Sequence, residues 1–185
     1  MAKKNLIIYF VLIFLILPGF LILSGCKSKN ILNIKFDDFI LKFNTAKNYL
    51  PLEFAKLESD LDINLIYAAK SDSIGTGVSS ILVSKNNIQQ NDSLKQTLNN
   101  NIDLISATIT GTTMQKYKSL KFKCDNIIIT GLFFNFQINQ SDLKNYFTQS
   151  FFFKDNYLYI ISFQTSNKSE NSNFITAVKN IKCTK

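Results

Sequence analysis

A long uncharged segment near the start of the chain limits what the rest can form. Eighteen residues without charge, Leu6–Leu23, follow Lys3-Lys4 and end just before Ser24-Gly25-Cys26. A cationic start, an apolar stretch and small residues at its end are typical of a secretory signal peptide. The alternative is a retained transmembrane helix, since about 20 apolar residues span a bilayer. Because Lys27-Ser28-Lys29 follows the cysteine, such a helix would have basic residues at both ends and an ambiguous orientation. We therefore expect a cleaved signal helix.

The end of this segment also predicts how the protein is held. Leu23-Ser24-Gly25-Cys26 resembles the lipobox of bacterial lipoproteins, in which an apolar residue and two small ones precede a cysteine. The resemblance implies a diacylglyceryl anchor on the Cys26 thiol, followed by cleavage between Gly25 and Cys26. Two acyl chains anchor durably, at about 0.8 kcal/mol per buried methylene. A plain secretory signal with a coincidental cysteine and an uncleaved anchor remain the alternatives. The lipoprotein hypothesis places the domain on the extracytoplasmic side of the cell membrane or outer membrane.

The length after the leader predicts one domain. Removing residues 1–25 leaves 160 of the 185 residues, which is enough for one core and short for two. A hydrophobic content of 46% and 17 Phe residues indicate a folded chain. We expect residues 26–35 to form the lipidated cysteine and a short tether, and residues 36–185 a single domain. The polar residues between Cys26 and Ile31 reach only ~15–20 Å when stretched, so the domain lies near the bilayer.

The chain is positively charged, but its basic residues are not of the type that favours recognition of nucleic acid. The net charge is +8, and all the basic residues are Lys, with no Arg and no His. Lysine lacks the bidentate fork with which Arg recognises phosphate and guanine. We therefore expect no nucleic-acid partner, and a mildly cationic surface drawn to anionic lipid headgroups or cell-wall polymers.

Two cysteines remain after Cys26 is assigned to lipid. Cys124 and Cys183 would be able to form a disulfide in an exported domain, where such bridges persist. A bridge here would attach the C-terminus to the sheet. Two separate buried thiols are the alternative, since free Cys packs as a small hydrophobe.

Hydrophobic periodicity predicts an α+β domain. Alternation of apolar and polar residues, or β-type composition, predicts strands near residues 39–43, 61–69, 78–84, 107–113, 119–124, 126–137, 146–153 and 157–165. One helix is expected after Asn91-Asp92-Ser93, with Leu94, Leu98, Ile102 and Ile105 on one face, and another after Ser172-Asn173, with Phe174, Ala177, Val178 and Ile181. The three residues Lys154-Asp155-Asn156 predict a hairpin connection. The fold class is therefore a mostly antiparallel sheet with about two main helices packed on it.

The order of these elements resembles the PsbP/Mog1/DcrB-like superfamily. The best local similarity begins at the aromatic strand Phe151-Phe152-Phe153 and continues through Tyr157–Phe163 to the helix Phe174–Ile181. A second strand of the form Tyr-x-Ile-x-Phe-x-Thr and a closing helix recur in such proteins. The early Pro-x-x-Trp often found there is absent, since the chain has Pro51 but no Trp. The resemblance implies an assembly or binding factor without shared catalytic residues.

The sequence offers little for catalysis. Without His, there are no Ser-His-Asp or Cys-His triads and no His-ligated metal. Ser141-Asp142-Leu143-Lys144 matches S-x-x-K, but its K-T-G and S-D-N partners are missing, so a hydrolase using Ser141 and Lys144 is only a remote alternative. Glu58, Asp60 and Asp62 do not have calcium-loop spacing. We expect no enzyme, no cofactor and no metal site.

Abundant aromatic residues define the two main functional hypotheses. The second half of the predicted sheet holds Phe133-Phe134, Phe136, Tyr146-Phe147 and Phe151–Phe153. We favour core burial between helices over an exposed apolar face, because exposed apolar patches are uncommon. The first hypothesis is a membrane-anchored envelope lipoprotein that binds or assembles a protein partner. The alternative is a carrier of lipid or another small apolar ligand, which would need an enclosed cleft among these strands.

Overall fold

The fold is antiparallel β-structure with two helices among the residues that the structure describes. This computed structural model describes residues 30–52, 64–71, 78–87, 93–108, 112–124, 126–140 and 143–184. The strands are β1 (Asn30–Phe36), β2 (Phe39–Thr45), β3 (Tyr49–Pro51), β4 (Leu65–Ser71), β5 (Ser80–Asn87), β6 (Thr112–Met114), β7 (Lys118–Cys124), β8 (Ile127–Gln140), β9 (Leu143–Lys154), β10 (Tyr157–Thr165) and β11 (Lys182–Cys183). The helices are α3 (Leu94–Thr108) and α4 (Lys168–Lys179). The predicted α+β class is confirmed.

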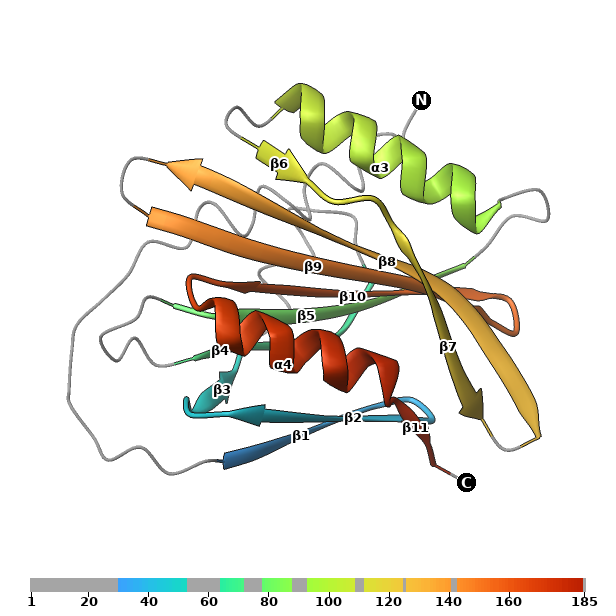
Figure 1. The fold of residues 1–185 in the computed structure, drawn as a ribbon. Helices are drawn as coiled ribbons and strands as arrows, with labels where there is room; N and C mark the ends of the chain where they lie inside the picture. Colours follow the sequence, from blue (N-terminus) through green and yellow to red (C-terminus); the bar gives the residue numbers. More distant parts are fainter. Residues whose placement is uncertain are drawn as a thin grey trace.

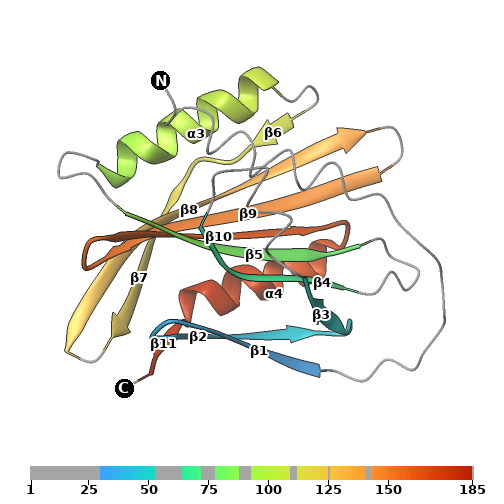
Figure 2. The ribbon, with the colours of Figure 1, turned by 180° about the vertical axis from the view of Figure 1, so that it is seen from behind.

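The strands form two sheets. A large sheet has the order β3-β4-β5-β10-β9-β8-β6, with β7 also paired to β8, and a small sheet has the order β1-β2-β11. All pairs are antiparallel. Helix α3 lies over one face of the large sheet, while α4 and the small sheet lie on the other side (Figures 1 and 2). The sheet is therefore sandwiched, with the small sheet as an outer layer.

The small sheet begins earlier than expected. Leu32, Ile34 and Phe36 turn toward the core, while Asn33 and Lys35 are exposed, which is the period of two of a strand with one buried face. The predicted tether 26–35 is therefore wrong in its second half, because residues 30–35 belong to β1. The first residues of the tether, 26–29, lie outside the described residues.

Helix α4 also begins earlier than the sequence pattern predicted. The Oδ1 of Asn167 accepts hydrogen bonds from the backbone N–H of Ser169 at 2.9 Å and of Glu170 at 3.1 Å. This cap satisfies donors that would otherwise have no partner. The expected start after Ser172-Asn173 is wrong, because Ser172 already lies inside the helix and its hydroxyl bonds the Lys168 carbonyl. Ile181 follows the helix and is buried.

Two smaller boundaries differ as well. The predicted strand near residues 107–113 starts too early, because Ala107 and Thr108 form the last turn of α3 and β6 begins at Thr112. The β9–β10 connection has two residues and not three, since Lys154 pairs with Tyr157. Asp155 takes the left-handed conformation in this turn, with φ of 54°, which Asp tolerates better than most residues. Helix α3 opens as expected, with the Oγ of Ser93 accepting the N–H of Gln96.

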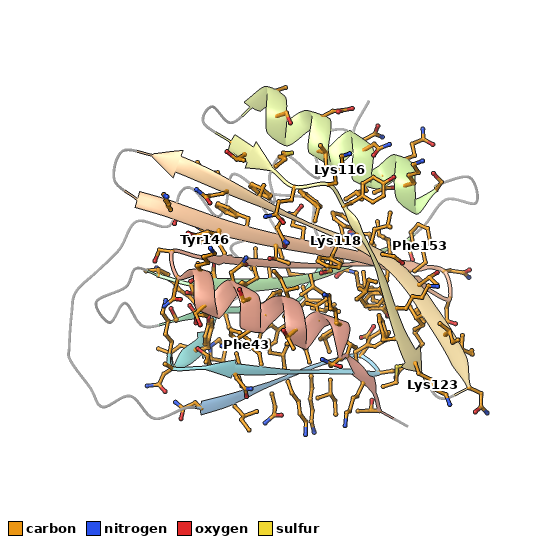
Figure 3. All side chains as sticks on the ribbon, viewed as in Figure 1. Phe43, Lys116, Lys118, Lys123, Tyr146 and Phe153 are labelled. Carbon is orange, nitrogen blue, oxygen red and sulfur yellow. A yellow bond between two sulfur atoms is a disulfide. The ribbon has the colours of Figure 1, made fainter. Side chains whose placement is uncertain are left out.

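The aromatic residues form the core on both faces of the large sheet. Phe151 and Phe152 are both fully buried, but they belong to different clusters because neighbouring residues of a strand point to opposite faces. Phe152 packs toward α4 and the small sheet, and Phe43 comes from β2 on that same side (Figure 3). Phe151 packs with Leu98 of α3. The structure thus shows the core burial that the sequence favoured over an exposed aromatic face.

Candidate functional site

The predicted lipidation site lies just outside the described residues. Gly25 and Cys26 precede the first described residue, Asn30, by a few positions, so the structure places neither of them. What it does show is that β1 starts at Asn30, which leaves only Lys27-Ser28-Lys29 between the cysteine and the fold. Neither α3 nor α4, the helices of the described part, is long and apolar enough to cross a bilayer.

The structure joins Cys124 and Cys183 in a disulfide. Cys124 ends β7, Cys183 lies in β11, and their Cα atoms are 5.1 Å apart. The bridge therefore connects the β7–β8 hairpin of the large sheet to the small sheet. It closes a long loop, with a sequence separation of 59.

Of the residues weighed for catalysis, the structure describes only Lys144. Lys144 is exposed on β9, and Ser141 lies outside the described residues, as do Glu58, Asp60 and Asp62. Within the described ranges no group of three or more Cys, Asp or Glu side chains is placed to hold a metal ion. The structure instead assembles a polar cluster that the sequence pattern did not predict.

This cluster is centred on the carboxylate of Glu170 and lies beneath the first turn of α4. Its other members come from three separate places in the chain: Thr45, Lys47 and Tyr49 around the end of β2 and the start of β3, Ser79 just before β5, and Thr165 at the end of β10. We call these six residues the Glu170 network. Four of the five partner residues are at most 7% exposed, and Tyr49 is half-buried.

Each oxygen of the carboxylate has several partners. Oε1 accepts hydrogen bonds from the hydroxyls of Thr45 and Tyr49, both at 2.9 Å. Oε2 accepts from the hydroxyl of Thr165 at 2.7 Å and lies 2.7 Å from the Ser79 hydroxyl. The Lys47 ammonium is 3.2 Å from the same Oε2. A buried charge costs little when it is paired and fully hydrogen-bonded in this way.

These contacts change the acid–base properties of the network. Burial raises the pKa of the Glu170 carboxyl, but the Lys47 charge and the hydroxyl donors outweigh it, so the net pKa lies below the usual value of 4.5. Burial, followed by the charge of Glu170, raises the pKa of Tyr49 far above its usual range. At neutral pH Glu170 is therefore a carboxylate and Tyr49 keeps its hydroxyl proton.

The network brings a serine and a lysine together, but not as a nucleophile and its base. The Lys47 ammonium donates to the Ser79 Oγ at 2.7 Å, and a general base must instead accept the serine proton. Lys47 is ion-paired with Glu170, and Ser79 has no exposed surface. The arrangement is one that connects α4 to β2, β5 and β10. Only Thr165, the last residue of the Tyr-x-Ile-x-Phe-x-Thr strand, had been marked by a sequence pattern.

A second charged group connects the two sheets at their hairpin turns. Asp37 accepts a hydrogen bond from the Tyr159 hydroxyl at 2.7 Å and forms an ion pair with Lys85 at 2.6 Å. Asp38, the other turn residue, pairs with Lys154 of the β9–β10 hairpin. Burial raises the pKa of Asp37. The hydrogen bonds from Lys85 and Tyr159, together with the charges of Lys85 and Lys154, lower it by more, so the net pKa lies below its usual value of 3.8. These partly exposed pairs fix the β1–β2 turn against the large sheet.

Comparisons with known proteins identify no family for this chain. No family model matches it, and no curated protein matches it. Among solved structures, it is similar to a crystal structure of PA94 from Pseudomonas aeruginosa, a protein of unknown function. The two share 10% identity with a TM-score of 0.44, over 80% of this chain and 90% of PA94.

Proposed function

We propose that this chain is a membrane-anchored lipoprotein of the cell envelope that binds or assembles a neighbouring protein and catalyses no reaction. The observation that carries the anchor is the position of the lipobox, Leu23–Cys26, which ends three residues before β1. An acylated Cys26 would leave a tether of Lys27-Ser28-Lys29 alone. A domain held so closely acts on partners at the membrane surface, on the extracytoplasmic side.

The chemistry of the interior supports a binding protein over an enzyme. The buried ionisable groups of the Glu170 network, Lys47 and Glu170, form an ion pair, and the hydroxyl of Ser79 is hydrogen-bonded to both of them. Reactive groups must instead be exposed to a substrate and free to exchange protons. This network has the arrangement of a structural connection.

We further propose that the domain belongs to the PsbP/Mog1/DcrB-like superfamily. The strand–turn–strand–helix segment that carries the resemblance forms β9, β10 and α4. Tyr159, Ile161, Phe163 and Thr165 are buried at alternate positions of β10, with Tyr159 bonded to Asp37 and Thr165 to Glu170. The pattern residues therefore all contribute to the same face.

The anchor is tested by metabolic labelling with palmitate and by fractionation of cells that express the full chain. The Cys26→Ser variant should lose the label and should accumulate as unprocessed precursor or appear in a soluble envelope fraction. The matched control, Cys124→Ala/Cys183→Ala, removes the other two cysteines and should keep the label. Palmitate on the Cys26→Ser protein, or an unacylated chain that starts at Met1 in a cytoplasmic extract, would contradict the proposal.

Binding is tested by native mass spectrometry of the acylated protein released from detergent micelles. A binding or assembly factor should carry a second polypeptide in defined stoichiometry and no constant small adduct. A constant adduct with the mass of a lipid would contradict this function and favour the carrier alternative.

A further inference from the structure

The outer face of the small sheet is basic and faces away from the core. Along β1 and β2 the side chains alternate, so that Lys35 and Lys42 are exposed while their neighbours are buried. Lys182 of β11 is exposed and pairs in register with Ile40, which also pairs with Lys35. We call Lys35, Lys42 and Lys182 the basic face. In Figure 1 the small sheet forms the lowest layer of the fold, with no described element below it.

Within β1, β2 and β11, which the structure describes in full, no acidic side chain alternates onto this face. The remaining exposed residues of the described β1 and β2 that share it are Ile31, Asn33 and Asn44. Asp37 and Asp38 lie in the turn between these strands and pair with Lys85 and Lys154 of the large sheet. The positive charge of the basic face is therefore not neutralised within its own strands, and it complements an anionic surface.

An acylated Cys26 would keep the start of this same face near the membrane. β1 is the edge strand of the outer layer, and its first residue is Asn30. Three residues separate Asn30 from Cys26, and the four steps from Cα to Cα, at 3.3–3.6 Å each when extended, span at most ~14 Å. The acyl chains on Cys26 would thus hold β1 within this distance of the lipid surface. Lys27 and Lys29 of the tether add two further positive charges.

Exposed apolar side chains lie at both ends of the basic face. Ile31, the second residue of β1, is 63% exposed next to the tether. Ile127 and Ile128, at the start of β8, are 69% and 68% exposed at the tip of the β7–β8 hairpin. The disulfide between Cys124 and Cys183 fixes this hairpin to β11 of the small sheet. Figure 1 shows the β7–β8 hairpin end on the same side of the fold as β11, and Figure 3 labels Lys123 near this end.

We propose that the basic face binds the surface of an anionic bilayer, with the hairpin tip Ile127-Ile128 inserted at the headgroup level. The inference rests on the proposed acylation of Cys26. Basic residues attract anionic headgroups, and apolar side chains at the interface add affinity. The domain then lies on the membrane in one orientation, with the small sheet toward lipid and α3 exposed to partners. The lipid anchor holds the protein, and the basic face orients it.

The experiment measures this orientation with the full acylated chain on vesicles. An environment-sensitive fluorophore is attached at Asn33→Cys on the exposed side of β1, and in a second protein at Gln96→Cys on the exposed side of α3. Vesicles are made of phosphatidylcholine alone or mixed with phosphatidylglycerol. The probe at residue 33 should shift to the blue and be quenched by spin-labelled lipid only on anionic vesicles. High salt should reverse the shift, and the probe at residue 96 should stay in water.

Charge variants then test the basic face itself. Each lysine near an anionic surface contributes about fivefold to the docking equilibrium, so Lys35→Gln/Lys42→Gln/Lys182→Gln should lower it roughly a hundredfold. The control Lys95→Gln/Lys116→Gln/Lys144→Gln removes the same charge from exposed positions elsewhere and should leave docking unchanged. Lys116 lies in the upper part of the fold, toward α3 (Figure 3).

The outcomes separate the anchor from the orientation. The same samples are tested for whether the chain floats with the vesicles. A chain that does not float with neutral vesicles has no working acyl anchor, and this result would overturn both the anchor and the orientation. Flotation on both vesicle types with the residue 33 probe in water would overturn the orientation and leave the anchor standing. Protection of residue 33 in native membranes but not on anionic vesicles would place a protein on this face, and would overturn the lipid assignment.

Discussion

The ammonium of Lys47 lies 3.2 Å from the Oε2 of Glu170, and both side chains are almost fully buried. Lys47 lies between β2 and β3, and Glu170 lies in the first turn of α4. The pair therefore connects the small sheet, the edge of the large sheet and the helix at a single point. Such a pair stabilises a fold only while both partners are present.

Glu170→Gln should destabilise the protein because it removes the carboxylate that pairs with the buried Lys47 ammonium. Breaking a buried pair from one side costs about 3–5 kcal/mol in the free energy of unfolding. Adding Lys47→Met should recover part of this loss, since the buried charge is then removed. Urea denaturation of the two variants measures both effects, with Asp103→Asn on the exposed side of α3 as the control. A loss of less than about 1 kcal/mol for Glu170→Gln would contradict the role of the pair.

The stability of the protein should fall in acid because the pKa of Glu170 is lower in the fold than in the unfolded chain. The stabilisation is complete above the unfolded value of 4.5, and it is lost as the pH falls through the lower folded value. Asp37, whose pKa is also lowered from its usual value of 3.8, contributes with the same sign. Melting temperatures measured down to about pH 3 should drop less steeply in Glu170→Gln than in the parent. Equal slopes would mean that Glu170 does not drive the acid transition.

Removal of the Cys124–Cys183 disulfide should lower stability without unfolding the sheets. With a sequence separation of 59, loop-closure entropy predicts that the bridge contributes about 4 kcal/mol to the free energy of unfolding. This figure is an upper value, because disulfides often deliver less than the entropy model predicts. Cys124→Ala/Cys183→Ala should therefore melt at a lower temperature than the parent, and a reductant should shift the parent but not the variant. A parent that is insensitive to reductant after denaturation would contradict the bridge.

Gly131→Ala should be destabilising because there is no room for a methyl group at this position of β8. A Cβ there would lie 2.4 Å from the carbonyl oxygen of Phe151 and 2.8 Å from the Cβ of Phe152 on the neighbouring β9. Backbone must move to accommodate it, which costs about 1–3 kcal/mol as in other overpacked cores. Thr130→Ala, at the adjacent exposed position, is the control. Chemical denaturation that shows equal stability for the two variants would refute this packing argument.

The fold class and most elements could be predicted because they depend on local periodicity. Phe39, Leu41 and Phe43 alternate with Ile40 and Lys42, and the structure buries the first set in β2. The start of a helix was predicted wrongly where a polar capping residue, and not the apolar pattern, sets it. Asn167 starts α4 by capping the N–H groups of Ser169 and Glu170, whereas the pattern had pointed to Ser172-Asn173.

The Glu170 network could not be predicted from the sequence. Its lysine and serine, Lys47 and Ser79, belong to no motif, and they meet Glu170 only because β2, β5 and α4 pack together. Of the Ser141–Lys144 motif the structure describes only Lys144, which lies exposed on β9. The contacts of the Glu170 network depend on the packing of elements that are far apart in the chain.

The sequence alone determined the leader pattern that ends in Cys26, the alternation of strands and helices, and the abundance of aromatic residues for a core. These properties are local, since each depends on residues within a few positions of one another. Only the tertiary structure decided that the strands divide into two sheets and that Lys35, Lys42 and Lys182 share one outer face. Strand order and register bring distant residues side by side, and they are set by the burial of both faces of the large sheet, not by any short segment.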